Sequence, residues 1–349
     1  MNITQSPFGT LEDRTPITAF TLSNNNGISV EILNYGGVIR ALNMPDREGK
    51  IEDIVLGFSN LRSYEKSQFY LGGIIGRYAN RIEKGLFYIG QRPYQLTLNN
   101  KNNHLHGGSI GLDKVVWKAT PFSSSNKVSL HLQHLSPHLH EGYPGNVEIV
   151  ALYTLTDDNV LEIIFKAKSD RDTILNLTNH ASFNLSGNMK SNVLEHKLYI
   201  NSLKFVHLNK QQIPTGKFCR VTNMPFDFSK TKSIGKDINE EDNQLHIGKG
   251  YDHCMVLNDK AFLKFGALLK DPISGRKLTI HTTKPGLQFY TGNYLAGIVG
   301  KHKKVYRKHD CVCLEAQHYP DSPNHSHFPS TLLKVGETYQ SKTLWKFES

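Results

Sequence analysis

The amino-acid sequence predicts an all-β protein built as a large antiparallel β-sandwich, and three observations carry this prediction. Apolar and polar residues alternate over many short segments, which is the pattern of half-buried strands. Gly, Pro, Asn and Asp residues separate these segments and favour turns. Helical periodicity is almost absent. Stacked sheets are therefore the expected way to bury the apolar faces.

The predicted strands follow one another as hairpins. Alternation is clear over residues 128–132. Segments 147–155 and 161–167 also alternate, and a Thr-Asp-Asp-Asn turn lies between them, so they predict a β-hairpin. Segments 263–267 and 278–280, joined through Asp-Pro-Ile-Ser-Gly, predict a second hairpin.

The sequence predicts one domain over residues 1–349. No internal repeat, low-complexity linker or composition shift marks a boundary. The chain is longer than a typical domain, but all-β folds often form single units of about 200–250 residues. Helix is expected only near residues 60–66 and 111–117, as one or two turns each.

The composition is that of a globular protein, because 38% of the residues are hydrophobic and 21% are charged. The formal net charge is +10, which leaves an anionic partner open, such as nucleic acid, a membrane surface or a phosphorylated substrate. The basic residues are scattered, however, and this favours a solvated surface. The one dense run, residues 301–309, holds a single aromatic, Tyr306, unlike a single-strand binder. We expect no nucleic-acid partner.

The chain is predicted to be cytoplasmic and not to bind membranes. Its first residues, MNITQSPFGT, lack the basic and apolar regions of a signal peptide, and no run approaches about 18 apolar residues. Four cysteines are too few for a disulfide framework at this length, and Cys311-Val-Cys313 is not a CxxC pair. Reduced, partly buried thiols are expected.

Glu315 and His180 have the chemistry of a general base and a general acid. Glu315 lies in a predicted strand, on the face opposite Leu314 and Ala316. Burial there would raise the pKa of its carboxyl group, which suits a base. An imidazole such as that of His180 titrates near neutral pH. On the residues alone, a solvated or arginine-paired glutamate and a core histidine satisfied by backbone groups stay open.

The sequence predicts neither a metal nor a nucleotide cofactor. His104, His106, His318, His325 and His327 could supply zinc ligands, but no spacing matches HExxH or paired CxxC. The segment Gly-Gly-Ile-Ile-Gly-Arg at residues 72–77 is neither GxGxxG nor a P-loop. A GxSxG nucleophile elbow is also absent.

Six segments rich in polar groups occur in an order that resembles the aldose 1-epimerase (galactose mutarotase) family. They are GRYANRI at 76–82, NNHLHGG at 102–108, TNHASFNL at 178–185, GYDH at 250–253, PGLQFYTGN at 285–293 and CLEAQHYPD at 313–321. The resemblance runs from Asn34 to Tyr339. It implies the galactose mutarotase-like supersandwich, a large sandwich of antiparallel sheets, and an isomerase that needs no cofactor.

The resemblance also implies roles for seven residues. The catalytic acid of the family falls on His180, and its catalytic base falls on Glu315. Its sugar-binding positions fall on Asn80, Arg81, His106, Asp252 and Gln288. The implied partner is a small aldose such as galactose or glucose, with the protein a monomer or a homodimer.

The implied reaction interconverts the α and β anomers of a pyranose. Ring opening requires a proton to leave the C1 hydroxyl and another to reach the ring oxygen. A carboxylate and a protonated imidazole can do both, and their roles reverse when the ring closes.

The chain departs from the family pattern at three places, and two other functions stay open. Ser182 stands where an aromatic that helps to wall the pocket is usual, Cys254 where Asn is frequent, and Lys334-Val335 where Arg-Pro is frequent. A hexose-phosphate 1-epimerase would need Arg77 or the basic run 301–308 beside Arg81. A non-catalytic sugar-binding protein would keep the fold alone.

Overall fold

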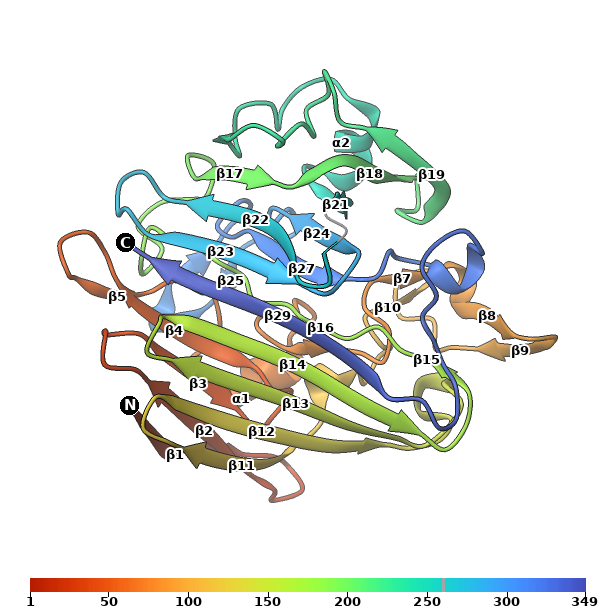
Figure 1. The fold of residues 1–349 in the computed structure, drawn as a ribbon, viewed down its shortest axis with the longest axis horizontal. Helices are drawn as coiled ribbons and strands as arrows, with labels where there is room; N and C mark the ends of the chain where they lie inside the picture. Colours follow the sequence, from red (N-terminus) through yellow and green to blue (C-terminus); the bar gives the residue numbers. More distant parts are fainter. Residues whose placement is uncertain (259–260) are drawn as a thin grey trace.

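The computed structural model describes residues 1–258 and 261–349, and strands dominate it (Figure 1). Every pair of named strands in this part of the chain is antiparallel. The prediction of an all-β, antiparallel protein is confirmed.

The largest sheet has nine strands and contains both predicted hairpins, β13–β14 and β22–β23. The C-terminal strand β29 lies between β14 and β23, so it joins the two halves of the sheet (Figure 1). In spatial order the strands are β11 (Lys118–Ser123), β12 (Lys127–Ser136), β13 (Val147–Thr156), β14 (Val160–Ser169), β29 (Tyr339–Glu348), β23 (Lys277–Thr282), β22 (Lys264–Lys270), β17 (Lys197–Ile200) and β20 (Lys232–Ser233).

Two five-stranded sheets complete the framework. The N-terminal sheet runs in chain order through β1 (Asn2–Thr10), β2 (Pro16–Ser23), β3 (Ser29–Leu33), β4 (Ile39–Pro45) and β5 (Ile51–Asp53). The second five-stranded sheet has the order β19 (Pro214–Arg220), β18 (Ser202–Leu208), β21 (Asp252–Leu257), β24 (Gly286–Tyr290) and β27 (Cys313–Gln317).

Short strand pairs and single helical turns connect these sheets. The pairs are β6 (Ile74–Ile75) with β16 (Thr178–Asn179), β7 (Arg81–Ile82) with β10 (His104–Leu105), β8 (Leu86–Ile89) with β9 (Arg92–Gln95), β15 (Thr173–Ile174) with β28 (Leu332–Leu333), and β25 (Ile298–Val299) with β26 (Val305–Tyr306). The 3-10 turns are η1 (Glu83–Gly85), η2 (Leu112–Lys114), η3 (His140–Gly142), η4 (Lys301–Lys303) and η5 (Ser322–Asn324).

The described residues form two short α-helices, and one of them was expected. α1 (Leu61–Lys66) begins after Asn60, whose side chain accepts a hydrogen bond from the Ser63 backbone N–H. The stretch 111–117 yields only the 3-10 turn η2. α2 (Asn243–Gly248) was not predicted, although Asp242 caps it in the same way.

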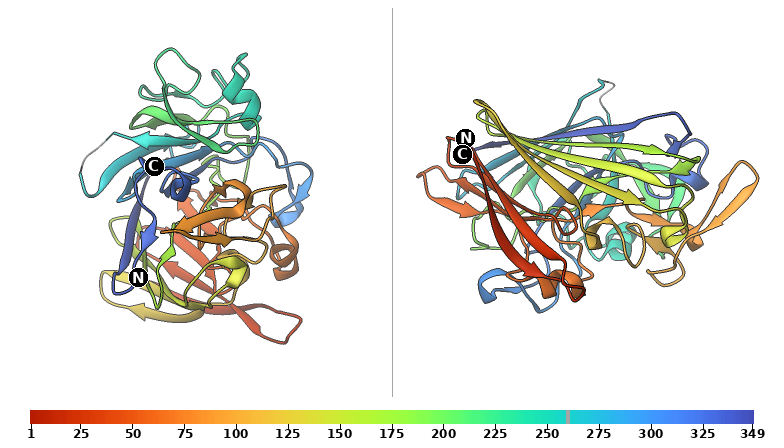
Figure 2. Two further views of the ribbon diagram at one scale, coloured as in Figure 1. Left: turned by 90° about the vertical axis from the view of Figure 1, so that its right-hand side faces the viewer. Right: turned by 90° about the horizontal axis from the view of Figure 1, so that it is seen from below.

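The apolar faces of the three sheets meet in one core. The largest core cluster joins Val30 of the N-terminal sheet, Leu130 of the nine-stranded sheet and Leu287 of the second five-stranded sheet. Figure 2 shows the red N-terminal strands and the yellow-to-green strands β11–β14 as layers that meet at one end and diverge. Because this cluster spans residues from Phe20 to Phe347, we propose that the chain forms a single domain.

A buried ionic cluster ties the segment after β16 to the N-terminal sheet. The Arg276 guanidinium is fully buried. It donates to Glu52 Oε2 at 3.2 Å, to the Lys50 carbonyl at 2.9 Å and to the Leu185 carbonyl at 3.2 Å. Lys190 donates to the same carboxylate at 2.5 Å. Burial raises the pKa of Glu52, but the hydrogen bonds from Lys190, Lys50 and Arg276 outweigh this effect and lower the pKa to about 2.

We expect Glu52→Gln to lower the free energy of unfolding by about 3–5 kcal/mol at pH 7, because it leaves the buried Arg276 without its counter-charge. Since the pKa of Glu52 is lower in the folded chain, the wild-type advantage is complete above about pH 4.5 and shrinks as the pH falls towards 2. Urea denaturation measures both effects. The control is Glu348→Gln, because Glu348 forms a half-exposed ion pair with Lys346. It should lower the free energy of unfolding by less than about 1 kcal/mol. Equal losses of stability in the two variants would contradict a stabilising role of the buried cluster.

Candidate active site

A cavity of about 450 Å³ gathers most of the residues that the sequence singled out, and this volume lies in the range of small-molecule sites. Its walls are formed by the strand pair β7–β10, the loops before β6 and after β16, the end of α2, and strands β21, β24 and β27. Six predicted residues line the cavity: Asn80, Arg81, His106, His180, Asp252 and Glu315. The seventh, Gln288, does not line it; its Nε2 donates to Asp252 Oδ1 at 2.7 Å.

Glu315 stands on β27, the edge strand of the second five-stranded sheet. In the register of β24 with β27, Gln288 lies opposite Glu315. Only 2% of Glu315 is exposed, and its Oε2 has no hydrogen-bond partner among the described residues. The carboxylate is therefore buried with one unpaired oxygen, and the residue contributes to the lining of the cavity.

His180 is fixed through its backbone. It follows β16, and its N–H donates to the Gly73 carbonyl at 2.9 Å, while its own carbonyl accepts from the Gly72 N–H at 2.9 Å. The neighbouring Asn179 amide also donates to the Gly72 carbonyl at 2.9 Å. The Gly72-Gly73 segment thus holds the imidazole at the cavity.

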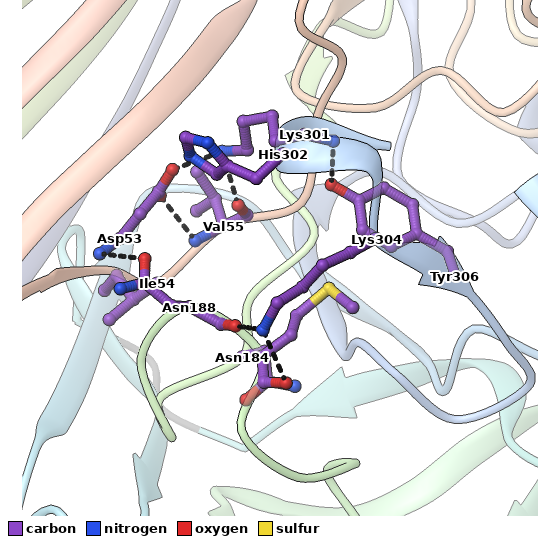
Figure 3. Close-up of a pocket in the computed structure, with 10 residues that line it drawn as sticks. Asp53, Ile54, Val55, Asn184, Asn188, Lys301, His302, Lys304 and Tyr306 are labelled. Carbon is purple, nitrogen blue, oxygen red and sulfur yellow. Dashed lines mark hydrogen bonds and ion pairs between the residues drawn. The ribbon is translucent and has the colours of Figure 1, made fainter. Parts of the chain in front are cut away.

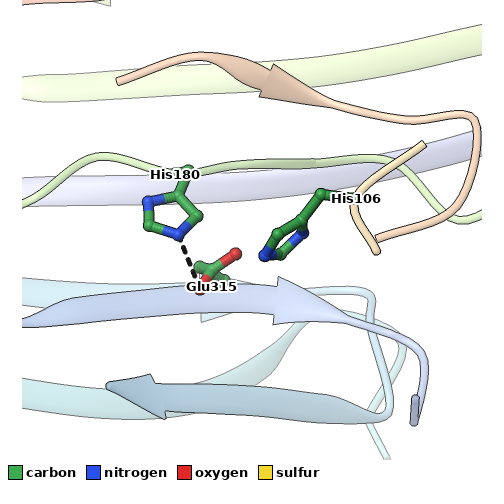
Figure 4. A group of neighbouring side chains, drawn as sticks. All are labelled: His106, His180 and Glu315. Atoms are coloured by element: carbon green, nitrogen blue, oxygen red, sulfur yellow. Dashed lines mark ion pairs between the residues drawn. The ribbon is translucent and has the colours of Figure 1, made fainter. Parts of the chain in front are cut away.

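His180 and Glu315 project toward one another from facing elements (Figure 4). His180 Nε2 lies 3.7 Å from Glu315 Oε1, which is longer than a hydrogen bond, so the hydrogen on Nε2 is not committed to the carboxylate. Burial is the largest single effect and would lower the pKa of His180, but the charge of Glu315, the contact with Cys313 and the residue's own backbone together outweigh it and raise the pKa to about 10. Burial raises the pKa of Glu315 to about 7, against the charge of His180. Near neutral pH the pair holds a protonated imidazole beside a carboxyl group that is partly ionised.

His106 is a neutral hydrogen-bond donor. Its Nδ1 accepts from the Asn80 N–H at 3.1 Å, so the ring hydrogen is on Nε2. Burial, followed by the charges of His180 and Arg81, lowers the pKa of His106 well below its usual value. Gly107 follows it at φ 91°, where a Cβ would come 1.7 Å from the Gly76 carbonyl oxygen.

The hydrogen bonds of His106 do not suit a metal site. His106, His180 and Glu315 offer ligand atoms within 4.8 Å of one another. However, Nδ1 of His106 is occupied by the Asn80 N–H, and Nε2 carries the hydrogen. His104, another zinc candidate, is a core residue: its two ring nitrogens lie 2.7 Å from the Thr97 carbonyl and 2.6 Å from the Tyr143 hydroxyl.

Gln212 connects two predicted sugar-binding residues, and sequence reasoning missed it. Its Oε1 accepts from Arg81 at 2.7 Å, and its Nε2 lies 3.3 Å from Asp252 Oδ2. Gln212 sits in the turn between β18 and β19, far from Arg81 in the chain, and no motif marks it. Tyr70, Tyr290 and Tyr294 also line the cavity without having been predicted.

The family model described as aldose 1-epimerase matches residues 18–346 of the chain. The chain belongs to the aldose 1-epimerase family. It is 40% identical to the galactose mutarotase of Mus musculus over 348 residues, which cover 99% of each chain. It is 33% identical to the aldose 1-epimerase of Escherichia coli K12 over 338 residues, or 96% of each chain.

A solved galactose 1-epimerase structure has the same fold. The galactose 1-epimerase of Lactobacillus acidophilus NCFM superimposes with a TM-score of 0.89 at 30% sequence identity, and the match covers 99% of this chain and 98% of the other. The expected galactose mutarotase-like supersandwich is therefore confirmed.

Two departures from the family pattern do not fall where we expected. Neither Ser182 nor Cys254 is among the residues that line the cavity, which corrects the expectation that Ser182 changes the pocket wall. Ser182 is buried behind His180, and Cys254 packs with Tyr319 and Phe328. The third departure, Lys334-Val335, is exposed.

The basic groups proposed to reach a phosphate lie elsewhere. Arg77 is buried and donates to Ser136 and to the carbonyls of Pro137 and Pro144. In the basic run, Lys301 is buried in an ion pair with Asp53 beside a separate, small cavity (Figure 3). Lys304 contacts the Asn188 carbonyl there. None of the residues that line this small cavity also lines the large one.

The charge of Glu315 is expected to control the protonation of His180. In Glu315→Gln, burial remains but the largest of the effects that raise the pKa of His180 is gone, so this pKa should fall from about 10. NMR titration of the imidazole nitrogens measures this. An unchanged His180 titration would contradict the electrostatic coupling of the pair.

Proposed function

We propose that the protein interconverts the α and β anomers of free aldohexoses such as galactose and glucose, with Glu315 as general base and His180 as general acid. One observation carries the proposal: in the cavity, Glu315 Oε1 lies 3.7 Å from Nε2 of an imidazole whose pKa is raised. This arrangement offers a proton acceptor and a proton donor to one small substrate.

The proposed ring opening uses both groups at one carbon. Glu315 takes the proton of the C1 hydroxyl, and the O–H electrons form the carbonyl bond of the open-chain aldehyde. The bond between C1 and the ring oxygen breaks, and that oxygen takes the proton from His180 Nε2. Both substrate oxygens are bonded to C1, so an acid and a base that serve them must be close neighbours, and these lie 3.7 Å apart.

Ring closure reverses these steps after C1 has rotated about its bond to C2. The rotated aldehyde presents its other face, His180 recovers its proton, and Glu315 returns one to the new C1 hydroxyl. No atom or electron is gained or lost overall. Each positioned acid or base typically contributes about 10²–10⁴ in rate.

The other cavity residues are proposed to bind sugar hydroxyls. Arg81 and the His106 Nε2–H can donate, and Asp252 can accept. Asn80 holds the backbone of this corner, since its N–H donates to His106. Gln288 acts beside Asp252 through their hydrogen bond. The tyrosines of the cavity wall offer flat faces to the apolar side of a sugar ring.

A hexose phosphate is the second candidate substrate, and one observation favours it. Lys101, Lys210 and Lys249 line the same cavity as Arg81, so an anionic substituent at its mouth would meet positive charge. A purely sugar-binding role is less consistent with the site, because binding alone does not require the buried pair of His180 and Glu315.

We further propose a cytoplasmic location and a monomer or homodimer. All four cysteines are free thiols, as is usual in reducing compartments. Among the described residues, no helix is long and apolar enough to cross a membrane.

Polarimetry of freshly dissolved α-D-galactose and α-D-glucose tests the assignment. We expect the wild-type protein to speed the decay of optical rotation. In Glu315→Gln the catalysed rate should fall by a factor of about 10²–10⁴, because the base is gone. His180→Asn should lose most activity with little loss of stability. Glu337→Gln, an exposed glutamate outside the cavity, is the matched control and should keep full activity.

The same assay separates the alternatives. An active Glu315→Gln would contradict the base assignment. A wild type inactive on free sugars but active on galactose 6-phosphate would favour the phosphate substrate. If the wild-type protein binds sugar but speeds the decay of optical rotation of neither the free sugars nor the sugar phosphate, the non-catalytic alternative is favoured.

A further inference from the structure

A thiol lies behind His180, on the side away from the substrate cavity. Cys313 Sγ is 3.7 Å from His180 Nδ1 and 3.3 Å from Ser182 Oγ. All three residues are buried, and neither Cys313 nor Ser182 lines the cavity. The imidazole therefore stands between Glu315 on one side and this thiol on the other.

We propose that Cys313 is a positioning residue for His180: its sulfur accepts the Nδ1 hydrogen, so that Nε2 is the nitrogen that releases and recovers the proton. The inference rests on the proposed function, in which His180 is the acid. Cys313 itself touches no reacting atom in this account.

The hydrogens along this contact can be assigned from chemistry. A protonated imidazole carries a hydrogen on each nitrogen; Nε2 faces Glu315 and Nδ1 faces the sulfur. Burial, with the neighbouring Cys311, raises the pKa of Cys313 well above its usual value, although the charge of His180 opposes this. Cys313 is therefore a neutral thiol whose S–H can point to Ser182 Oγ while its sulfur accepts from Nδ1.

This arrangement sets the tautomer of the imidazole after proton transfer. When Nε2 has given its proton to the ring oxygen, the remaining hydrogen must stay on Nδ1, because only then does Nε2 have a lone pair to take the proton back. The Cys313 sulfur is the side-chain partner of Nδ1, at 3.7 Å. Without an acceptor there, a buried N–H would be unsatisfied and the protonated ring would be less stable.

A sulfur acceptor also leaves Glu315 as the charged partner of His180. Thiol sulfur is a weak acceptor, so it holds the ring without adding a second negative charge. A carboxylate at Nδ1 would raise the pKa of His180 further and make it a poorer acid. Titratable groups face His180 from several elements. They are Glu315 and Cys313 of β27, Asp252 of β21, Tyr290 of β24, Asp113 of η2, and Tyr70 and His106 of the loops.

Ser182 holds the Cys313 thiol in place through a hydrogen bond. Its backbone is fixed, since its carbonyl accepts from the Leu56 N–H at 2.8 Å. The serine occupies the position where an aromatic is usual in the family, and its hydroxyl fills the space behind His180 with a hydrogen-bond partner for sulfur. The departure at Ser182 therefore acts on the orientation of the acid.

The test compares Cys313→Ala, Cys313→Ser and Cys254→Ala in the full chain, by polarimetry on galactose across pH. In Cys313→Ala we expect kcat to fall about tenfold with KM changed less than about twofold, because a hydrogen bond to a charged group is lost. The high-pH limb of the kcat profile should move to lower pH, since the protonated ring loses an acceptor. Cys313→Ser restores an acceptor and should recover most of kcat and the limb.

Cys254→Ala is the matched control, because it removes an equally buried thiol that does not contact His180. Its kcat and pH profile should be those of wild type.

Ser182→Ala is a milder variant that replaces Cys313→Ala in the test if the latter does not fold. It should lower kcat about two- to threefold. Alanine and serine variants of Cys313 that lose activity equally, with an unmoved high-pH limb, would overturn the inference. A Cys313→Ala or Ser182→Ala variant with the same kcat and the same pH profile as the wild-type protein would also overturn it. Failure of the proposed function is distinct, because either the wild type would then not speed the mutarotation of galactose or Glu315→Gln would keep its activity.

Discussion

The site depends on two opposite charges buried side by side. Moving a lone carboxylate or imidazolium out of water is costly, and mutual attraction offsets that cost only when both are held in place. Glu315 and His180 are both nearly inaccessible to solvent and lie 3.7 Å apart. The gap is too long for a hydrogen bond, so the attraction keeps His180 protonated without consuming the hydrogen on Nε2.

The fold holds these charges from separate elements. Glu315 is fixed by the ladder of the second five-stranded sheet, where β24 pairs with β27. His180 is fixed by the Gly72-Gly73 backbone, and the segment that follows it is tied to the N-terminal sheet through Arg276. The backbones of both residues are therefore held by hydrogen bonds from different parts of the fold. The geometry between them is thus a property of the packed sheets, which suits preorganised acid–base chemistry.

The sequence predicted the sheets well and the surroundings of the site less well. Period-two alternation gave both long hairpins, because each strand buries one face. The motif order brought His180 and Glu315 to one cavity. Gln212 was missed because it reaches the cavity from a turn distant in the chain, and no local pattern records such a contact. Ser182 was misplaced because a motif gives a residue's position in the chain, whereas the side on which a small side chain packs depends on its neighbours, here Cys313.

The pH dependence of kcat/KM on galactose, from about pH 5 to pH 11, tests the central claim most directly. Glu315 must be ionised, so the rate should fall as the pH drops through its raised pKa of about 7. His180 must be protonated, so the rate should fall again as the pH rises through about 10. We therefore expect a bell-shaped pH profile of kcat/KM, with a plateau between about pH 7 and pH 10. A rate that rises from an ordinary carboxyl pKa near 4.5 and already falls near 6.5 would contradict it, since neither group would then feel the other's charge or its own burial.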